Sequence, residues 1–221
     1  MLVLAASSLG RVFEDLAAAF EARHPGVAVA VSAAPTPELV AQVSAGAPAD
    51  LIATADVESI EVLAAGGSLR DGWSVIARNR IVLVVPAANP DGIGGLADLA
   101  AADLVLGLGH EGVPVGRYAE AVLTAEGIDV PPTAVRLRSA TDVVARVADG
   151  EVDVGIAYAT DVRGVPAVAS IVIAEAENID IAYPMAVLAG TPSPALAAEL
   201  FAFVASTEGR SILRAHGFLS P

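Results

Sequence analysis

The chain has 221 residues, of which 55% are hydrophobic and 17% charged, so it can bury the core of one large domain or two small ones. Its 26 acidic and 12 basic side chains give a formal net charge of −14, which disfavours binding to nucleic acid or to anionic membranes. The absence of cysteine excludes disulfides, thiolate chemistry and cysteine-bound zinc. No apolar run reaches the roughly 20 residues that a membrane-spanning helix needs.

The first predicted elements are a strand and a helix joined by serine. Residues 2–6 form an apolar run typical of a buried strand, and apolar residues then recur from Leu9 to Phe20 with the spacing of one helix face. We predict that this helix begins at or next to Ser8 and ends near residues 24–26. A helix start carries unpaired N–H groups and the positive end of the helix dipole, so Ser8 is either an anion-binding residue or simply an N-cap.

A second junction of this kind follows. Residues 27–32 are predicted as a covered strand, and Thr36, followed by proline and glutamate, has the composition of a helix N-cap. Residues 51–56 are predicted as another short strand, and residues 57–65 as the next helix. Thr36 therefore occupies the same kind of position as Ser8.

The middle of the chain continues the alternation of strands and helices. Residues 81–86 are the most strand-like run, residues 96–101 favour a short helix, and residues 104–109 favour a strand. The third junction lies at residues 113–116, before a helix. It offers no hydroxyl group, so any ligand contact there would come from a backbone N–H such as that of Val115, which a nearby glycine helps to expose.

The fourth junction lies at residues 139–143, where hydroxyl groups again precede a helix that includes Val143. Residues 152–158 are predicted as a strand that ends on Tyr158, and α/β proteins bind ligands outside the carboxyl ends of their strands. The last predicted elements are strands at residues 135–137, 171–173 and 181–188 and helical patterns at residues 196–203 and 212–213.

This alternation predicts an α/β protein with mostly parallel sheets flanked by helices. Two long strands, at residues 81–86 and 183–188, could each pass from one lobe to another. Under this hypothesis lobe one contains residues 1–80 and 186–221, and lobe two contains residues 81–185.

An enzymatic function finds little support in the sequence. The three histidines are His24, His110 and His216, and the first and last lie beside predicted helix ends, where a structural role is common. His110 and Glu111 could form an acid–base or metal pair, but two adjacent loop residues make a poor site. The sequence contains none of the common hydrolase, metalloprotease or phosphate-loop motifs, so we expect neither catalysis nor a cofactor.

Other conspicuous residues have structural interpretations. Asp50 and Asp56 lie at strand edges, and helix capping is a better interpretation of Asp56 than metal binding. Trp73 is expected to be partly buried, and the glycines of residues 92–95 lack dinucleotide-binding spacing and fit a linker. Arg117 either lies near a ligand or pairs with a glutamate, Glu111 or Glu120.

With these residues laid out, the chain resembles the molybdate-binding proteins of ABC importers over nearly its whole length. No single segment is specific, but their order and spacing are. The matching segments are residues 5–9, 42–56, 113–119, 141–143, 155–158, 183–187, 209–213 and 217–218.

This resemblance implies a two-lobed periplasmic-binding-protein-like fold that holds a tetrahedral oxyanion in a cleft through neutral donors only. Carried over by position, it assigns hydroxyl and N–H donors to Ser8, the role of a serine to Thr36, backbone N–H donors to Val115 and Val143, and a phenol donor to Tyr158. The protein would bind no metal directly, because a molybdate or tungstate centre would be contacted only through its oxygens.

The resemblance also implies a location and partners. We expect a monomeric receptor that delivers molybdate or tungstate to an ABC transporter permease and acts outside the cytoplasm, in the periplasm or lipid-anchored at the cell surface, with its signal absent from this sequence. The chain departs from the family's serine-rich pattern at residues 34–38, where two prolines remove N–H donors and Glu38 adds a carboxylate. A different small anion such as sulfate, or a ligand-sensing effector domain, therefore remains an alternative.

Overall fold

The computed structural model describes residues 1–100, 104–175 and 177–221. The chain divides into two compact units: unit 1 contains Met1–Arg78 and Ile181–Pro221, and unit 2 contains Asn79–Asp180. The expected second boundary, between residues 185 and 186, falls inside the strand Ile181–Leu188, which belongs to unit 1 because it hydrogen-bonds into the sheet of that unit. None of the helices in these described ranges is long and apolar enough to cross a membrane.

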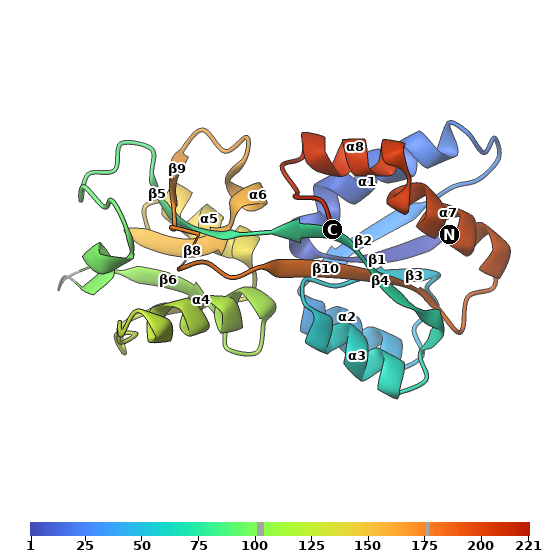
Figure 1. Cartoon of the computed structure of the whole chain (residues 1–221), viewed down its shortest axis with the longest axis horizontal. Helices are drawn as coiled ribbons and strands as arrows, with labels where there is room; N and C mark the ends of the chain where they lie inside the picture. The colour runs from blue at the N-terminus through green and yellow to red at the C-terminus, as the bar shows by residue number, and fades with distance from the viewer. Residues whose placement is uncertain (101–103, 176) are drawn as a thin grey trace. The chain divides into compact units, whose positions relative to one another are not determined.

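Unit 1 is a five-stranded sheet in the order β2-β1-β3-β10-β4, with α1, α7 and α8 on one face and α2 and α3 on the other (Figure 1). β1 is parallel to β2 and β3, whereas β10 is antiparallel to β3. Its elements are β1 (Leu2–Ala6), a 3₁₀ turn η1 (Ser7–Leu9), α1 (Gly10–Glu21), β2 (Ala30–Ala34), α2 (Thr36–Ser44), β3 (Leu51–Ala53), α3 (Val57–Ala65), β4 (Leu69–Asn79), β10 (Ile181–Leu188), α7 (Pro194–Ala205) and α8 (Thr207–Ala215).

The core of unit 1 follows the apolar spacing of its elements. The apolar face predicted for the first helix is buried in α1, where Leu16 and Phe20 are at most 1% exposed. On the other side of the sheet, α2 and α3 pack their apolar residues onto the strands, and Trp73 lies partly buried against the same cluster, as expected. Each large apolar side chain buried in this way contributes about 1.5–3 kcal/mol to folding.

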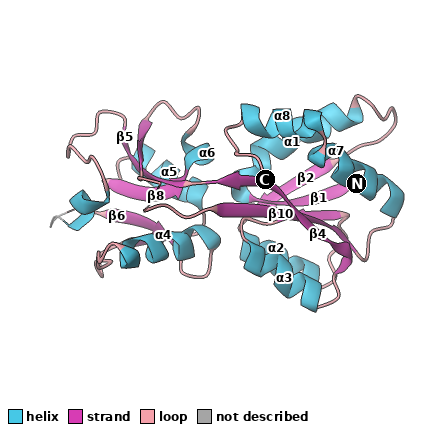
Figure 2. Ribbon diagram, viewed as in Figure 1, coloured by secondary structure: helices cyan, strands magenta, loops and turns pink. Residues whose placement is uncertain are grey.

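Unit 2 is a second five-stranded sheet, in the order β7-β6-β8-β5-β9. Its strands β5, β6 and β8 are labelled in Figure 2. β6 is parallel to β7 and β8, whereas β5 is antiparallel to both β8 and β9, so the sheet is mixed rather than mostly parallel. Its elements are β5 (Ile81–Pro86), η2 (Leu96–Ala100), β6 (Leu106–Gly109), α4 (Pro114–Ala125), β7 (Val135–Leu137), α5 (Ala140–Ala148), β8 (Val154–Tyr158), α6 (Ala159–Val162) and β9 (Val168–Val172).

Some elements differ from those predicted. The strand expected at residues 27–32 is β2 at Ala30–Ala34, and the short helix expected at residues 96–101 is η2, with residue 101 outside the described residues. β4 was not predicted, because charged residues and Gly72 near its start are typical of a loop. In the structure Gly72 has a positive φ of 95°. Pairing with β10 holds this polar segment in a strand.

Candidate functional site

The carboxyl ends of three parallel strands in unit 1 meet at one edge of the sheet. Ala6, the last residue of β1, lies opposite Ala34, the last residue of β2, and β3 ends beside them. Ser8 follows β1 and Thr36 follows β2. The structure therefore brings these two predicted binding residues to the same edge of one sheet.

Ser8 lies in η1, between β1 and α1, so the predicted helix start at or next to Ser8 is a 3₁₀ turn. Its hydroxyl is hydrogen-bonded to the Tyr183 hydroxyl at 3.3 Å. Because hydroxyl hydrogens rotate, Tyr183 can donate to Ser8 Oγ when Ser8 donates to another acceptor. Tyr183, in β10, is fully buried, and its ring packs edge-on against Phe218 with a centroid distance of 5.4 Å. Tyr183 was not among the predicted site residues, although it begins one of the segments that carry the family resemblance.

Thr36 is the first residue of α2 rather than its N-cap, because the extended Pro35, with ψ of 136°, occupies the capping position. The Thr36 side chain is buried, and its Oγ1 accepts a hydrogen bond from the Ala55 N–H at 3.3 Å. Its own hydroxyl hydrogen can therefore serve a different acceptor. The N–H of a first helical residue has no partner inside the helix, so Thr36 offers an amide as well as a hydroxyl.

Unit 2 repeats this arrangement with other chemical groups. Its parallel strands β6, β7 and β8 end at one edge, where Gly109 lies opposite Leu137 and Gly107 lies opposite Gly155. The segments that contain Val115, Val143 and Tyr158 follow or end these strands. Unit 2 thus brings its own predicted residues to one edge of its sheet.

The Val115 backbone N–H lies at the start of α4. α4 begins with Pro114, which has no N–H, and the Gly116 N–H donates to the Val113 carbonyl at 3.0 Å, so Val115 provides the amide at this helix start. The junction is closely packed: a Cβ placed on Gly116 would lie 2.2 Å from the His110 carbonyl oxygen. Glycine is required there by space.

The expected role of Val143 requires a correction. Its N–H donates to the Ser139 carbonyl at 3.2 Å, because the fourth residue of a helix already reaches back to the capping residue. Its side chain is fully buried against β8, where a Cβ on Gly155 would lie 2.3 Å from Val143 Cγ1. The amide without a helical partner belongs instead to Ala140, the first residue of α5.

Tyr158 ends β8 and caps the short helix α6. Its side chain is 3% exposed, and in the sheet it lies opposite Ile81 of β5. The predicted position of this phenol, at the carboxyl end of a strand, is therefore the one observed. Together with the amides of Val115 and Ala140, it gives unit 2 three neutral donors.

Comparison with known proteins identifies the family. Residues 1–219 match the family model described as bacterial extracellular solute-binding protein. The chain is also 35% identical, over 100% of its length and 85% of the relative, to the molybdate-binding protein ModA of Mycobacterium tuberculosis. This chain belongs to the bacterial extracellular solute-binding proteins.

Solved structures share the fold of this solute-binding protein. The periplasmic molybdate-binding protein of Azotobacter vinelandii has a TM-score of 0.89 at 21% identity, with 100% of this chain and 99% of that chain covered. The sulfate-binding protein SubI of Mycobacterium tuberculosis has a TM-score of 0.87 at 19% identity, with 99% and 85% covered. These two proteins are named for different anions, so the fold alone does not select the anion.

In this solute-binding protein, Arg136 forms ion pairs with acidic side chains at and before α4, the helix that contains Val115. Its guanidinium lies 2.6 Å from a Glu120 carboxylate oxygen and 3.8 Å from one of Glu111. Arg117, for which these two glutamates were the expected partners, donates to the Gly112 carbonyl at 3.2 Å. Arg136 therefore offsets the acidic charge beside the start of α4.

The three histidines of the solute-binding protein take part in packing and surface contacts. The His24 ring stacks on Phe20 with centroids 4.0 Å apart, and His216 Nε2 lies 2.8 Å from an Asp15 carboxylate oxygen. His110 Nδ1 accepts a hydrogen bond from the Gly112 N–H within its own loop. Within the described ranges, no group of three or more histidines and carboxylates is arranged to hold a metal ion.

The strand-edge carboxylates also have structural partners. Asp56 accepts a hydrogen bond from the Ser59 N–H at 2.6 Å, which confirms its predicted role as a helix cap. Asp50 accepts hydrogen bonds from the Leu2 N–H at 2.7 Å and from the Thr191 hydroxyl. Asp50 therefore ties the first strand to the segment after β10.

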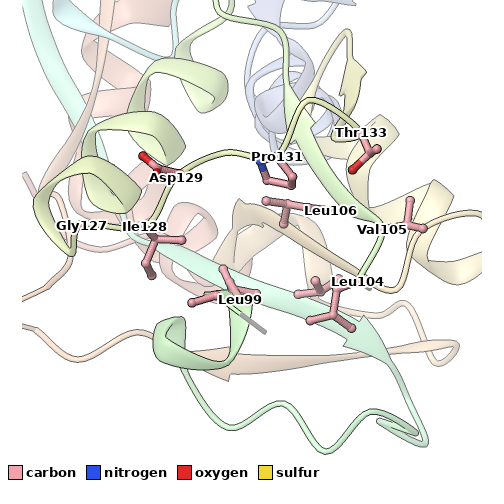
Figure 3. Close-up of a pocket in the computed structure, with 11 residues that line it drawn as sticks. Leu99, Leu104, Val105, Leu106, Gly127, Ile128, Asp129, Pro131 and Thr133 are labelled. Atoms are coloured by element: carbon pink, nitrogen blue, oxygen red, sulfur yellow. The ribbon is translucent and has the colours of Figure 1, made fainter. Parts of the chain in front are cut away.

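A cavity of about 570 Å³ lies elsewhere in unit 2, at the amino ends of β6 and β8 (Figure 3). None of the described residues that line it is a predicted binding residue. Its lining is mostly apolar, and the carboxyl ends of the same strands carry the candidate donors. The lining residues are Leu99, Ala100, Leu104, Val105, Leu106, Gly127, Ile128, Asp129, Pro131, Thr133 and Val154.

Proposed function

We propose that this protein is the solute receptor of an ABC importer and that it binds molybdate or tungstate as an intact tetrahedral oxyanion. The proposed donors of unit 1 are the hydroxyls and amides of Ser8 and Thr36. The proposed donors of unit 2 are the amides of Val115 and Ala140 and the phenol of Tyr158.

One observation carries this proposal. In a chain 35% identical along its whole length to a molybdate-binding protein, each unit gathers neutral donors at the carboxyl edge of its parallel strands. Three helices, α2, α4 and α5, begin at these edges. Anions bind readily at such helix starts, because N–H groups and the positive end of the helix dipole face the ligand.

Neutral donors can hold a dianion if together they replace the stabilisation that water provides. Removing the dianion from water costs tens of kcal/mol by idealised Born arithmetic, and the site must return an equivalent field. The three helix starts together carry roughly one and a half positive charges, and hydrogen bonds to a charged group are about twice as strong as neutral ones. Because the chain has a net charge of −14, attraction must come from these local groups rather than from long-range steering.

The same donors favour fully deprotonated anions. Backbone N–H groups cannot accept the proton that phosphate partly retains at neutral pH, so a protonated anion that sets its O–H against an N–H would lose a hydrogen bond. Sulfate meets this requirement as well as molybdate does, and only the spacing of the donors can separate the two by size. Pro37, which lacks an N–H, reduces the number of donors at α2 and keeps sulfate as the second candidate.

The proposed function also specifies the oligomeric state, the membrane partner and the location of the protein. The protein would bind and release its ligand without chemical conversion, as a monomer that docks on a membrane permease. It would act in the periplasm or lipid-anchored at the cell surface.

Isothermal titration calorimetry with molybdate, tungstate, sulfate and phosphate tests the ligand. We expect saturable heat with molybdate and tungstate, weaker binding of sulfate, and none of phosphate. At a ligand concentration of one hundred times Kd, the ligand should also stabilise the protein by about 2.7 kcal/mol. Absence of both heat and thermal stabilisation with all four anions would overturn the oxyanion proposal, and preference for sulfate would redirect it to the second candidate.

A further inference from the structure

Hydrogen bonds of Ala159 and Thr160 join the turn after Tyr158 to other elements of unit 2. The Ala159 N–H donates to the Arg80 carbonyl at 2.9 Å. The Asn79 side-chain amide donates to Thr160 Oγ1 at 2.8 Å, and Asn79 is 1% exposed. These two contacts fasten α6 to the segment that leads into β5.

A third contact fastens the same turn to the start of α5. Thr141, the second residue of α5, donates its hydroxyl hydrogen to Asp161 Oδ1 at 3.0 Å. The bond therefore links α5 to α6: Thr141 follows Ala140 directly, and Asp161 lies three residues after Tyr158. Ala140 and Tyr158 are both proposed donors, so this bond joins the segments that carry them.

Asp161 is itself a poor candidate for binding an oxyanion. An ionised carboxylate only accepts hydrogen bonds, and it repels a dianion. Its presence in the turn beside Tyr158 therefore needs another explanation, and the hydrogen bond from Thr141 supplies one. Thr141 is exposed in the structure, so this bond contributes little to folding stability.

We propose that Thr141 is a positioning residue for the oxyanion site. Through its bond to Asp161, Thr141 holds the Tyr158 phenol at a fixed spacing from the amide of Ala140. This inference rests on the proposed function. A fixed spacing between two donors fits tetrahedral anions of one size better than those of another. The Thr141–Asp161 bond therefore contributes to the choice between molybdate and sulfate as well as to affinity.

Thr141→Val is the test substitution, because it removes the hydroxyl but keeps the side-chain volume and the backbone N–H. We expect molybdate affinity to fall about two- to tenfold, the effect of one lost neutral hydrogen bond, with an unchanged melting temperature. The preference for molybdate over sulfate should fall as well. Thr141→Ser, which retains the hydroxyl, should restore both quantities, and Thr141→Ala provides a second variant without it.

A double-mutant cycle with Tyr158→Phe separates positioning from other effects. If Thr141 acts by placing the phenol, Thr141→Val should change affinity less than twofold once the phenol hydroxyl is removed. Additive effects, or unchanged affinity in Thr141→Val, would overturn this inference while leaving the proposed function intact. Failure of the unaltered protein to bind any of the anions would overturn the proposed function, and this inference with it.

Discussion

The two units present the same kind of edge but different chemistry. The proposed donors of unit 1 include the side-chain hydroxyls of Ser8 and Thr36, whereas those of unit 2 are the backbone amides of Val115 and Ala140 and one phenol. Hydroxyl donors can be deleted by a single side-chain substitution. Amide donors belong to the backbone, so most substitutions leave them in place and only a change of backbone chemistry or path removes them.

The two units also differ in the groups that support their proposed donors. In unit 1, polar neighbours orient the hydroxyls: Ser8 contacts Tyr183, and Thr36 accepts from Ala55. In unit 2, close packing places the amides, and the clearest example is Gly116 against the His110 carbonyl. Mutations should therefore act mainly on affinity in unit 1 and on both stability and affinity in unit 2.

The largest effect is expected for Gly116→Ala. The new Cβ would lie 2.2 Å from the His110 carbonyl oxygen, so the backbone at the start of α4 must move, at a cost of about 3 kcal/mol or more. Thermal unfolding should show this loss, and molybdate titration should show weakened binding through Val115. Gly112→Ala in the same loop is the control, because its Cβ would meet only His110 Nδ1 at 3.5 Å. Equal stability of the two variants would contradict the packing argument.

Ser8→Ala and Thr36→Ala test the hydroxyl donors of unit 1. Each removes a hydrogen bond to a charged ligand, which is worth roughly 1.5–3 kcal/mol, or about ten- to a hundredfold in affinity. Calorimetric titration with molybdate measures the loss. Ser7→Ala is a matched control, because it removes a neighbouring hydroxyl in η1 that is not a proposed donor. Unchanged affinity in both test variants would exclude the two hydroxyls from the site.

Ala140→Pro tests a backbone amide of unit 2 directly. Proline is well accepted at the first position of a helix, and the extended Ser139, with φ of −155° and ψ of 166°, suits a residue before proline. α5 should remain intact while one donor disappears, and molybdate affinity should fall about tenfold.

Val143→Ala provides the contrast for Ala140→Pro. It should destabilise the fold by roughly 1–3 kcal/mol through lost packing against Gly155, with unchanged affinity. Unchanged molybdate affinity in Ala140→Pro, with α5 intact, would refute the assignment of this donor to Ala140.

The smallest effect is expected for Glu38→Gln in unit 1. Glu38 lies in the first turn of α2, two residues after Thr36, and its carboxylate is exposed. Removing this charge should raise molybdate affinity by about twofold or less, because exposed charges interact weakly in water. The gain should shrink as salt is added, which titrations at two ionic strengths would show. Lower affinity in this variant would mean that Glu38 supports the site rather than opposing the anion.

Local patterns in the sequence predict the alternation of strands and helices and the edge at which the candidate donors lie. Apolar spacing is a local property, so β1, β5 and the buried face of α1 could be predicted from it. Serine and threonine at strand-to-helix junctions likewise indicated Ser8 and Thr36, because capping depends on neighbouring residues. The order of the matching segments, rather than any single motif, indicated the family.

Which amide is available and which strands pair depend on the folded structure rather than on local sequence patterns. β4 is a strand because β10 lies beside it, which its polar residues do not reveal. Val143 and Ala140 lie less than one helical turn apart in α5. The Ser139 cap sets the exact start of this helix, and that start decides which N–H remains without a helical partner. The Thr141–Asp161 bond joins residues 20 apart in the chain, a distance that local spacing cannot encode.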